Sequence, residues 1–249
     1  MTVFPIASSS SGNLCVIENS TTSIIIDAGI PLKGIKPLCK KVDAIFVTHS
    51  HTDHVSGIGP IHRHYKAPIY IKRSAYNDKP KVFEKCELVE LQETPATLIG
   101  DFIVEPFPTK HDTPSFGYYV TDWSSKRSVC LITDTGFITP LMKKYASKAD
   151  VLMLEADYDV TSLEEFEEYP DFLKARIASD WGHLSNEQST KFIRELLDEG
   201  KKFLKVVFIH MSVRTNSEEL LMNQVEKDIP EILPIVTLAP TTKPIDLDE

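Results

Sequence analysis

The sequence predicts one α/β domain over residues 1–249, built as an αββα sandwich of two mixed β-sheets with helices on their outer sides. The chain has 249 residues, of which 42% are hydrophobic, enough to fill one complete core. Runs rich in Val and Ile come first with only turns between them, and later alternate with helical patterns. This order favours two packed sheets over one all-parallel, doubly wound sheet.

The candidate strands are short apolar runs bounded by Ser, Gly, Asn or Thr. They cover residues 3–7, 14–18, 23–27, 44–48, 68–71, 102–107, 117–121, 128–133, 151–154, 205–209 and 235–238. The candidate helices cover residues 55–65, 139–147, 186–199 and 217–228. In the third helix Ser185 and Gln188 form a capping-box pattern, and Gly200 follows the last turn. We expect residues 239–249, with their prolines and acids, to be a loosely ordered tail.

The net charge of −9 argues against a protein that grips nucleic acid over its whole surface. Basic residues between positions 33 and 73 leave a local basic patch open, although solvated helix faces explain them equally well. No segment has the length and hydrophobicity of a membrane span, so we expect a cytoplasmic protein. The widely spaced cysteines predict reduced thiols, most of them buried: Cys15, Cys39, Cys86 and Cys130.

Four side chains that can bind metal follow the candidate strand at 44–48 within six residues. His49 and His51 are two positions apart and can converge on one ion, because such residues share one side of an extended segment. Asp53 and His54 lie next to each other on a turning backbone and can point toward a second ion. Three histidines and an aspartate at this density indicate a metal site.

His62 and His64 repeat the His-x-His spacing but fall within a helical pattern. Positions i and i+2 of a helix face different sides, so the two rings do not converge. We expect surface or capping roles for both.

The segment from His49 to His54 resembles the H-x-H-x-D-H signature of metallo-β-lactamase-fold hydrolases, and the strand ending at Asp27 resembles the element before it. The resemblance implies two divalent ions, Zn²⁺ or Mn²⁺, with Fe as a further option. Asp27 would hydrogen-bond the histidine segment without touching metal. One ion would be held by His49, His51 and His111, the other by Asp53, His54 and His210, and Asp134 would bridge both.

Two further motifs resemble subgroups of this fold. The run Ser8–Asn13 and the motif Gly182-His183-Leu184-Ser185-Asn186 resemble the YycJ/WalJ-type exonucleases, although residues 155–159 depart from that subgroup's usual Glu-Ser-Asn-His-Asp. The Gly-His-x-Ser pattern also resembles the RNase Z group, in which such a histidine transfers a proton and Glu155 matches its partner. The candidate catalytic residues are therefore His183, Glu155 and the ligand Asp53. A helix-capping histidine without chemistry is the alternative for His183.

The loop Ser10, Ser11, Gly12 and Asn13 is a candidate phosphate or substrate loop, since hydroxyls and backbone N–H groups near a glycine suit an anion. These residue types are equally ordinary in a hairpin turn. Spacing alone leaves both interpretations open.

The first functional hypothesis is a metal-dependent phosphodiesterase that hydrolyses nucleic acid, DNA rather than RNA, as an exonuclease. A metal-bridging hydroxide would attack phosphorus, because two ions lower the pKa of water to near neutrality. The second hypothesis is a phosphodiesterase of cyclic or other small nucleotides. The third is a ligand-sequestering protein on the same fold, which the presence of all seven expected ligands disfavours.

Overall fold

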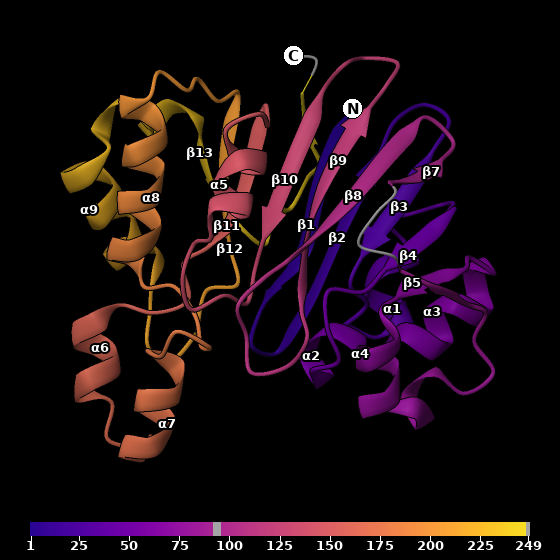
Figure 1. The fold of residues 1–249 in the computed structure, drawn as a ribbon, viewed down its shortest axis with the longest axis horizontal. Coiled ribbons are helices and arrows are strands. Elements are labelled where there is room, and N and C mark those ends of the chain that lie inside the picture. Colours follow the sequence, from indigo (N-terminus) through magenta and orange to yellow (C-terminus); the bar gives the residue numbers. More distant parts are fainter. Residues whose placement is uncertain (92–95, 248–249) are drawn as a thin grey trace.

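The computed structural model of the chain describes residues 1–91 and 96–247. Two seven-stranded sheets pack face to face, and helices cover their outer sides (Figure 1). The strand orders are β14-β1-β2-β3-β4-β5-β6 and β13-β12-β11-β10-β9-β8-β7. The predicted αββα sandwich is confirmed.

The first sheet is antiparallel from β14 through β3 and parallel from β3 through β6. Its strands are β1 (Thr2–Ser9), β2 (Gly12–Glu18), β3 (Ser23–Ile26), β4 (Ala44–Phe46), β5 (Ile69–Ile71), β6 (Leu88–Glu90) and β14 (Ile245–Asp246). The second sheet is antiparallel from β7 through β10 and parallel from β10 through β13. Its strands are β7 (Thr97–Ile99), β8 (Phe102–Pro108), β9 (Phe116–Asp122), β10 (Ser128–Ile132), β11 (Val151–Glu155), β12 (Lys205–Ile209) and β13 (Val236–Leu238).

Most helices form two outer layers, and one further pair lies at an end of the sandwich. Over the first sheet lie α1 (Leu32–Ile35), α2 (Thr52–Val55), α3 (Ile58–Tyr65), α4 (Arg73–Asp78) and the 3₁₀ helix η1 (Pro80–Phe83). Over the second lie α5 (Pro140–Ala146), α8 (Asn186–Asp198), α9 (Glu218–Asp228) and η2 (Pro230–Ile235). The remaining pair, α6 (Val160–Glu165) and α7 (Asp171–Ile177), lies below the second sheet in Figure 1, at the same end of the molecule as α2.

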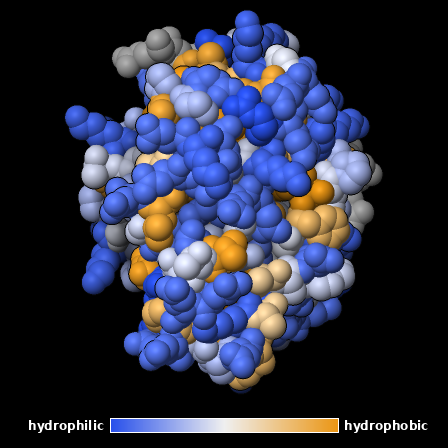
Figure 2. Space-filling view, turned by 90° about the vertical axis from the view of Figure 1, so that its left-hand side faces the viewer, coloured by the Kyte–Doolittle hydropathy of each residue, from blue (hydrophilic) through white to orange (hydrophobic). Residues whose placement is uncertain are grey.

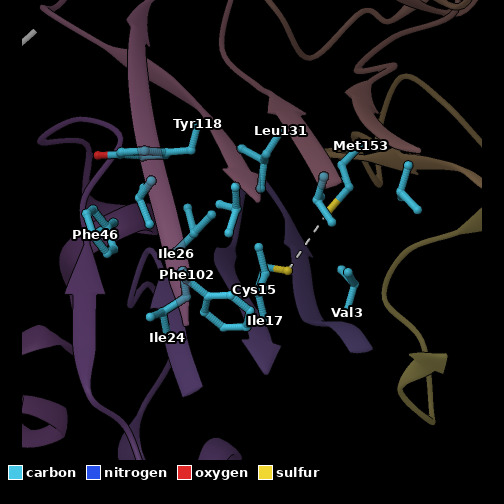
Figure 3. Close-up of a cluster of buried hydrophobic side chains, with 14 of the residues drawn as sticks. Val3, Cys15, Ile17, Ile24, Ile26, Phe46, Phe102, Tyr118, Leu131 and Met153 are labelled. Carbon is cyan, nitrogen blue, oxygen red and sulfur yellow. Dashed lines mark hydrogen bonds between the residues drawn. The ribbon is translucent and has the colours of Figure 1, made fainter. Parts of the chain in front are cut away.

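The inner faces of the two sheets meet in a buried core cluster, shown in Figure 3. Cys15 of the first sheet and Met153 of the second meet there with their sulfur atoms 4.0 Å apart. The Tyr118 hydroxyl on β9 donates a 2.6 Å hydrogen bond to the carbonyl oxygen of Val47, just after β4. This bond ties the second sheet to the start of the histidine segment.

Two of the expected elements need correction. The single helix expected over 55–65 begins earlier and is two helices, α2 and α3, separated at Ser56 and Gly57. The expectation of a loose tail is wrong for residues 239–247, because β14 pairs with β1 and Leu247 is buried in the core cluster between the sheets. Residues 248–249 lie outside the described residues.

Two other expectations concern cysteines and membrane spans. None of the four cysteines forms a disulfide, and all are buried except the half-buried Cys86. Among the described residues, no helix has both the length and the apolar character needed to cross a membrane.

Candidate metal centre

The candidate site lies at one end of the sandwich, where strands of both sheets end. Asp27, Asp134 and His210 come within two residues of the ends of β3, β10 and β12. Each has a positive φ, at 60°, 53° and 52°. This left-handed backbone costs a non-glycine residue about 1–2 kcal/mol and occurs preferentially at functional sites. The neighbouring structure therefore holds these three residues in place.

The first predicted ligand set, His49, His51 and His111, is brought together. One ring nitrogen of each lies within 4.8 Å of the others, and His51 Nδ1 is 3.3 Å from His111 Nε2. A tetrahedral zinc ion with bonds of about 2.0–2.1 Å spaces its ligand atoms by roughly 3.3–3.4 Å. His49 Nε2 is buried and has no hydrogen-bond partner among the described residues. The spacing and the unpartnered nitrogen both fit a metal ligand.

The second predicted set, Asp53, His54 and His210, also converges. Asp53 Oδ2 lies 3.2 Å from His54 Nε2 and 3.6 Å from His210 Nε2. In the described part of the chain, neither buried nitrogen of His210 has a hydrogen-bond partner. A buried polar atom without a partner costs about 1–3 kcal/mol, and a bound ion would remove that cost for His210 Nε2.

Asp134 lies between the two sets. Its Oδ1 is 3.8 Å from His49 Nε2, 3.7 Å from His111 Nε2 and 3.6 Å from His210 Nε2. Its Oδ2 is 3.4 Å from His54 Nε2. The structure thus gathers all seven predicted ligands in one cluster. Histidine and carboxylate donors without a thiolate fit Zn²⁺, Mn²⁺ or Fe.

Asp27 contacts the histidine segment and, within residues 1–91 and 96–247, belongs to none of the groups that could hold an ion. It accepts hydrogen bonds from the Thr48 backbone N–H and hydroxyl, both at 2.8 Å, and lies 2.7 Å from His54 Nδ1. By fixing Nδ1, it turns the lone pair of His54 Nε2 toward the cluster. Gly29 permits this close packing, because a Cβ there would lie 1.5 Å from the Asp53 carbonyl oxygen.

The candidate phosphate loop covers the two-residue turn between β1 and β2 and the first two residues of β2. Ser10 and Ser11 are exposed in this turn, whereas Gly12 is buried. Asn13 Nδ2 donates to Asp53 Oδ2 at 3.0 Å and also lies 3.0 Å from His54 Nε2. Asn13 therefore orients candidate ligands, and phosphate binding by this turn stays a prediction.

The candidate catalytic pair is close in space. His183 Nδ1 lies 3.1 Å from Glu155 Oε2, and Glu155 is fully buried. The same carboxylate accepts hydrogen bonds from the backbone N–H groups of Asp134 at 3.0 Å and Thr135 at 2.7 Å. Glu155 therefore fixes both the proposed proton donor and the proposed bridging ligand.

Carboxylates around His183 hold its proton. Burial alone would lower the pKa of His183, but Asp157, Glu155 and Asp134 raise it to about 9. The ring is stacked on His210, with centroids 5.1 Å apart and an interplanar angle of 11°. His183 is therefore protonated at neutral pH in the metal-free chain. It also falls within two of the groups that could hold an ion, so a ligand role is its structural alternative.

Two acidic residues of the site have no role in the sequence analysis. Asp157 Oδ1 lies 3.5 Å from His210 Nδ1, and Asp112 Oδ1 lies 3.3 Å from His51 Nε2. Asp157 faces the His210 nitrogen that does not point into the cluster, as carboxylates that orient metal ligands do. Asp112 Oδ1 also lies 3.4 Å from His111 Nε2, a candidate ligand atom, so Asp112 borders the cluster itself. Their closeness in sequence to Glu155 and His111 was the only signal for them.

Among the residues that the structure describes, His62 and His64 belong to none of the groups that could hold an ion, as expected. His62 Nδ1 donates to the Ala67 carbonyl oxygen at 2.8 Å, and Nε2 accepts from the Glu87 backbone N–H at 3.2 Å. His62 thus joins the end of α3 to the chain before β6.

Known proteins resemble this chain in sequence and in fold. A family model described as a β-lactamase superfamily domain matches residues 22–211. The exodeoxyribonuclease WalJ of Streptococcus pneumoniae is 33% identical over 232 residues, with 86% of this chain and 83% of that protein covered. The resemblance to the YycJ/WalJ-type exonucleases is therefore confirmed.

Solved structures show the same fold at lower identity. The metallo-β-lactamase fold protein YhfI from Bacillus subtilis superposes with a TM-score of 0.77 at 16% identity and covers 98% of both chains. The short form of human tRNase Z gives 0.70 at 18% identity and covers 99% of both. From the domain match and the relative at 33% identity, the chain belongs to the β-lactamase superfamily and has the metallo-β-lactamase fold.

Proposed function

We propose that this protein is a divalent-metal-dependent phosphodiesterase that hydrolyses DNA from an end. The observation that carries the proposal is the placement of Asp134 between two convergent ligand sets, with the Glu155–His183 pair beside them. The exodeoxyribonuclease name of the Streptococcus pneumoniae relative supports the substrate.

Two ions would be held as the two ligand sets suggest, one by the His49 set and one by the His54 set, with Asp134 shared. When bound, such a pair lowers the pKa of water to near neutrality and neutralises charge on phosphoryl oxygens. Asp27 and Asn13 hold His54 and Asp53 in position for this. The unpartnered nitrogens of His49 and His210 support the assignment.

His183 would supply the proton that the leaving oxygen needs. As the P–O bond breaks, the protonated ring donates from Nε2, and Glu155 holds the proton on Nδ1 and so fixes the ring's direction. A deoxyribose alkoxide is a poor leaving group, so this transfer matters more for DNA than for an activated ester. General acid catalysis of this kind contributes typically 10²- to 10⁴-fold.

The test uses protein reconstituted separately with Zn²⁺ and with Mn²⁺. Its substrates are end-labelled single- and double-stranded DNA, end-labelled RNA and cyclic nucleotides. We expect metal-dependent release of nucleotides from DNA ends, abolished by chelation. Cleavage of cyclic nucleotides alone would favour the small-nucleotide hypothesis. Binding of nucleotides without cleavage of any substrate would favour the sequestering protein.

A further inference from the structure

An exposed tryptophan lies at the rim of the metal centre. Trp181, in the loop between α7 and His183, is 55% exposed. The next residue, Gly182, accepts a 3.1 Å hydrogen bond from His111 Nδ1 through its carbonyl oxygen. The indole is thus one residue from a group that orients a candidate metal ligand. A large aromatic side chain left open at this place is a candidate contact for the substrate.

The loop that carries Trp181 is fixed in place. The His183 backbone N–H donates to the Ile177 carbonyl oxygen at 2.9 Å. A Cβ at Gly182 would lie 2.1 Å from the Ile177 carbonyl oxygen, so the loop packs tightly on the end of α7. The indole is therefore displayed on a rigid support.

Two cations lie beside this tryptophan. The Lys110 ammonium is 5.5 Å from the centre of the indole ring and makes no ion pair with the described residues. Arg176 on α7 is held by Asp112, which accepts from its Nε at 2.8 Å and also from Nη2. Arg176 Nη1 has no hydrogen-bond partner in the described part of the chain, and the side chain is 53% exposed. The Lys110 ammonium is therefore available to a phosphate, whereas Arg176 offers Nη1 while its charge is paired with Asp112.

A second aromatic side chain continues the surface. Phe172 is 77% exposed and lies four residues before Arg176 on α7, so the two share one side of that helix. Figure 2 shows the side of the molecule with α6 to α9 as mainly hydrophilic, with hydrophobic side chains in small separate patches. Aromatic residues next to cations match the base stacking and phosphate contacts that a single strand of nucleic acid makes.

We propose that Trp181, Lys110 and Arg176 bind an unpaired nucleotide next to the scissile phosphate, and that Phe172 contacts a second base. Bases stack on the aromatic rings, and the cations bind the phosphates between them. A base within a duplex hides both its faces, so the site accepts a single-stranded or frayed end. This inference rests on the proposed nuclease function and adds that the strand bound at the site is unpaired.

The chain contains a matched control for this site. Trp123, the other of its two tryptophans, is 60% exposed and has the Lys126 ammonium 4.1 Å from its ring. It follows β9, whereas the metal centre lies beyond the opposite end of that strand. The two pairs differ in their position relative to the metal centre.

Binding is measured by tryptophan fluorescence with a phosphorothioate oligothymidylate on metal-reconstituted protein. In Trp123→Phe, where Trp181 is the sole indole, we expect saturable quenching. In Trp181→Phe we expect none. Quenching of both to the same extent, or of Trp123 alone, overturns the proposal. Lys110→Ala should lower the slope of log affinity against log salt by about 0.7, the contribution of one phosphate contact on a single strand.

Kinetics on single-stranded DNA give a second readout. Trp181→Ala should raise KM about 5- to 150-fold, the equivalent of 1–3 kcal/mol of base stacking, and Trp181→Tyr should recover most of the loss. Trp123→Ala should match the wild type. If DNA is hydrolysed and the two alanine variants behave alike, the nucleotide site is wrong and the nuclease function stands. If oligothymidylate quenches Trp181 but no phosphodiester is cleaved, the function is wrong and the binding site stands.

Discussion

Glu155 Oε2 lies 3.1 Å from His183 Nδ1 and also accepts a 3.0 Å hydrogen bond from the backbone N–H of Asp134. One buried carboxylate oxygen therefore contacts both the proposed proton donor and the proposed bridging ligand. Substitutions at His183 test proton transfer, and substitutions at Asp134 test metal binding.

His183→Ala should keep the bound ions and lose roughly 10²- to 10⁴-fold in turnover on a phosphodiester with a poor leaving group. With an activated aryl phosphodiester, whose leaving oxygen needs no proton, the loss should be much smaller. Both turnovers and the metal content are measured on the same samples. An equal loss on both substrates would indicate substrate positioning, and a loss of metal would make His183 a ligand.

The pH dependence should show His183 as an acid. Its pKa is raised from about 6.5 to about 9 in the metal-free chain, so the proton is present at neutral pH and is lost as pH rises through that value. Bound cations oppose this rise in pKa. The alkaline limb of the pH profile of kcat should therefore have its midpoint between about pH 6.5 and pH 9. Glu155→Gln removes a charge that raises this pKa and should move the limb to lower pH. If the alkaline limb is unchanged in His183→Ala, His183 is not the group that causes it.

Asp27→Asn should weaken metal binding without removing a ligand. The asparagine tolerates the positive φ of this position but replaces the charged acceptor that fixes His54 and Thr48. We expect metal affinity to fall about 10- to 100-fold. Asp122→Asn is the control, since Asp122 is equally buried and accepts hydrogen bonds in the turn after β9. Equal metal affinities for both variants, measured by competition with a chelating dye, would refute the role of Asp27.

The histidines should divide into ligands and non-ligands. Reconstituted wild-type protein should bind about two divalent ions per chain, since the ligands form two sets around Asp134. His54→Ala should preferentially empty one position, whereas His62→Ala should bind as many ions as the wild type, because His62 hydrogen-bonds to the backbone of Ala67 and Glu87, away from the cluster. Elemental analysis measures this. A single ion in the wild type would leave the bridging role of Asp134 without support.

The sequence was sufficient for the architecture because the strands of four or more residues contain apolar runs bounded by turn residues, as at Ser23–Ile26 and Lys205–Ile209. It missed β6, β7 and β14, which have only two or three residues each and draw their stability from neighbouring strands. It also missed α1, α4, α6, α7 and the two 3₁₀ helices, which have four to seven residues each and are too short for an extended apolar stripe. The end of the chain looked loose because the burial of Leu247 depends on tertiary contacts.

The candidate site was predictable where its residues carry a local pattern. His49 to His54 lie within one short segment, and Asp134 and His210 follow recognisable strands. The contacts of Asp112 with His51 and of Asp157 with His210 join loops from distant parts of the chain. Trp181 and Lys110 are likewise 71 residues apart in sequence (181 − 110) and meet only through the fold.

The most direct test of the central claim compares Asp134→Asn with the wild type on end-labelled DNA, with bound metal measured on the same samples. Asparagine keeps the size and tolerates the left-handed backbone of this position, so the change removes mainly the charge. We predict that the variant releases nucleotides roughly 100-fold more slowly or worse and binds less metal, and that chelation abolishes the wild-type reaction. A variant as fast as the wild type, or a wild-type rate that survives chelation, would contradict the account.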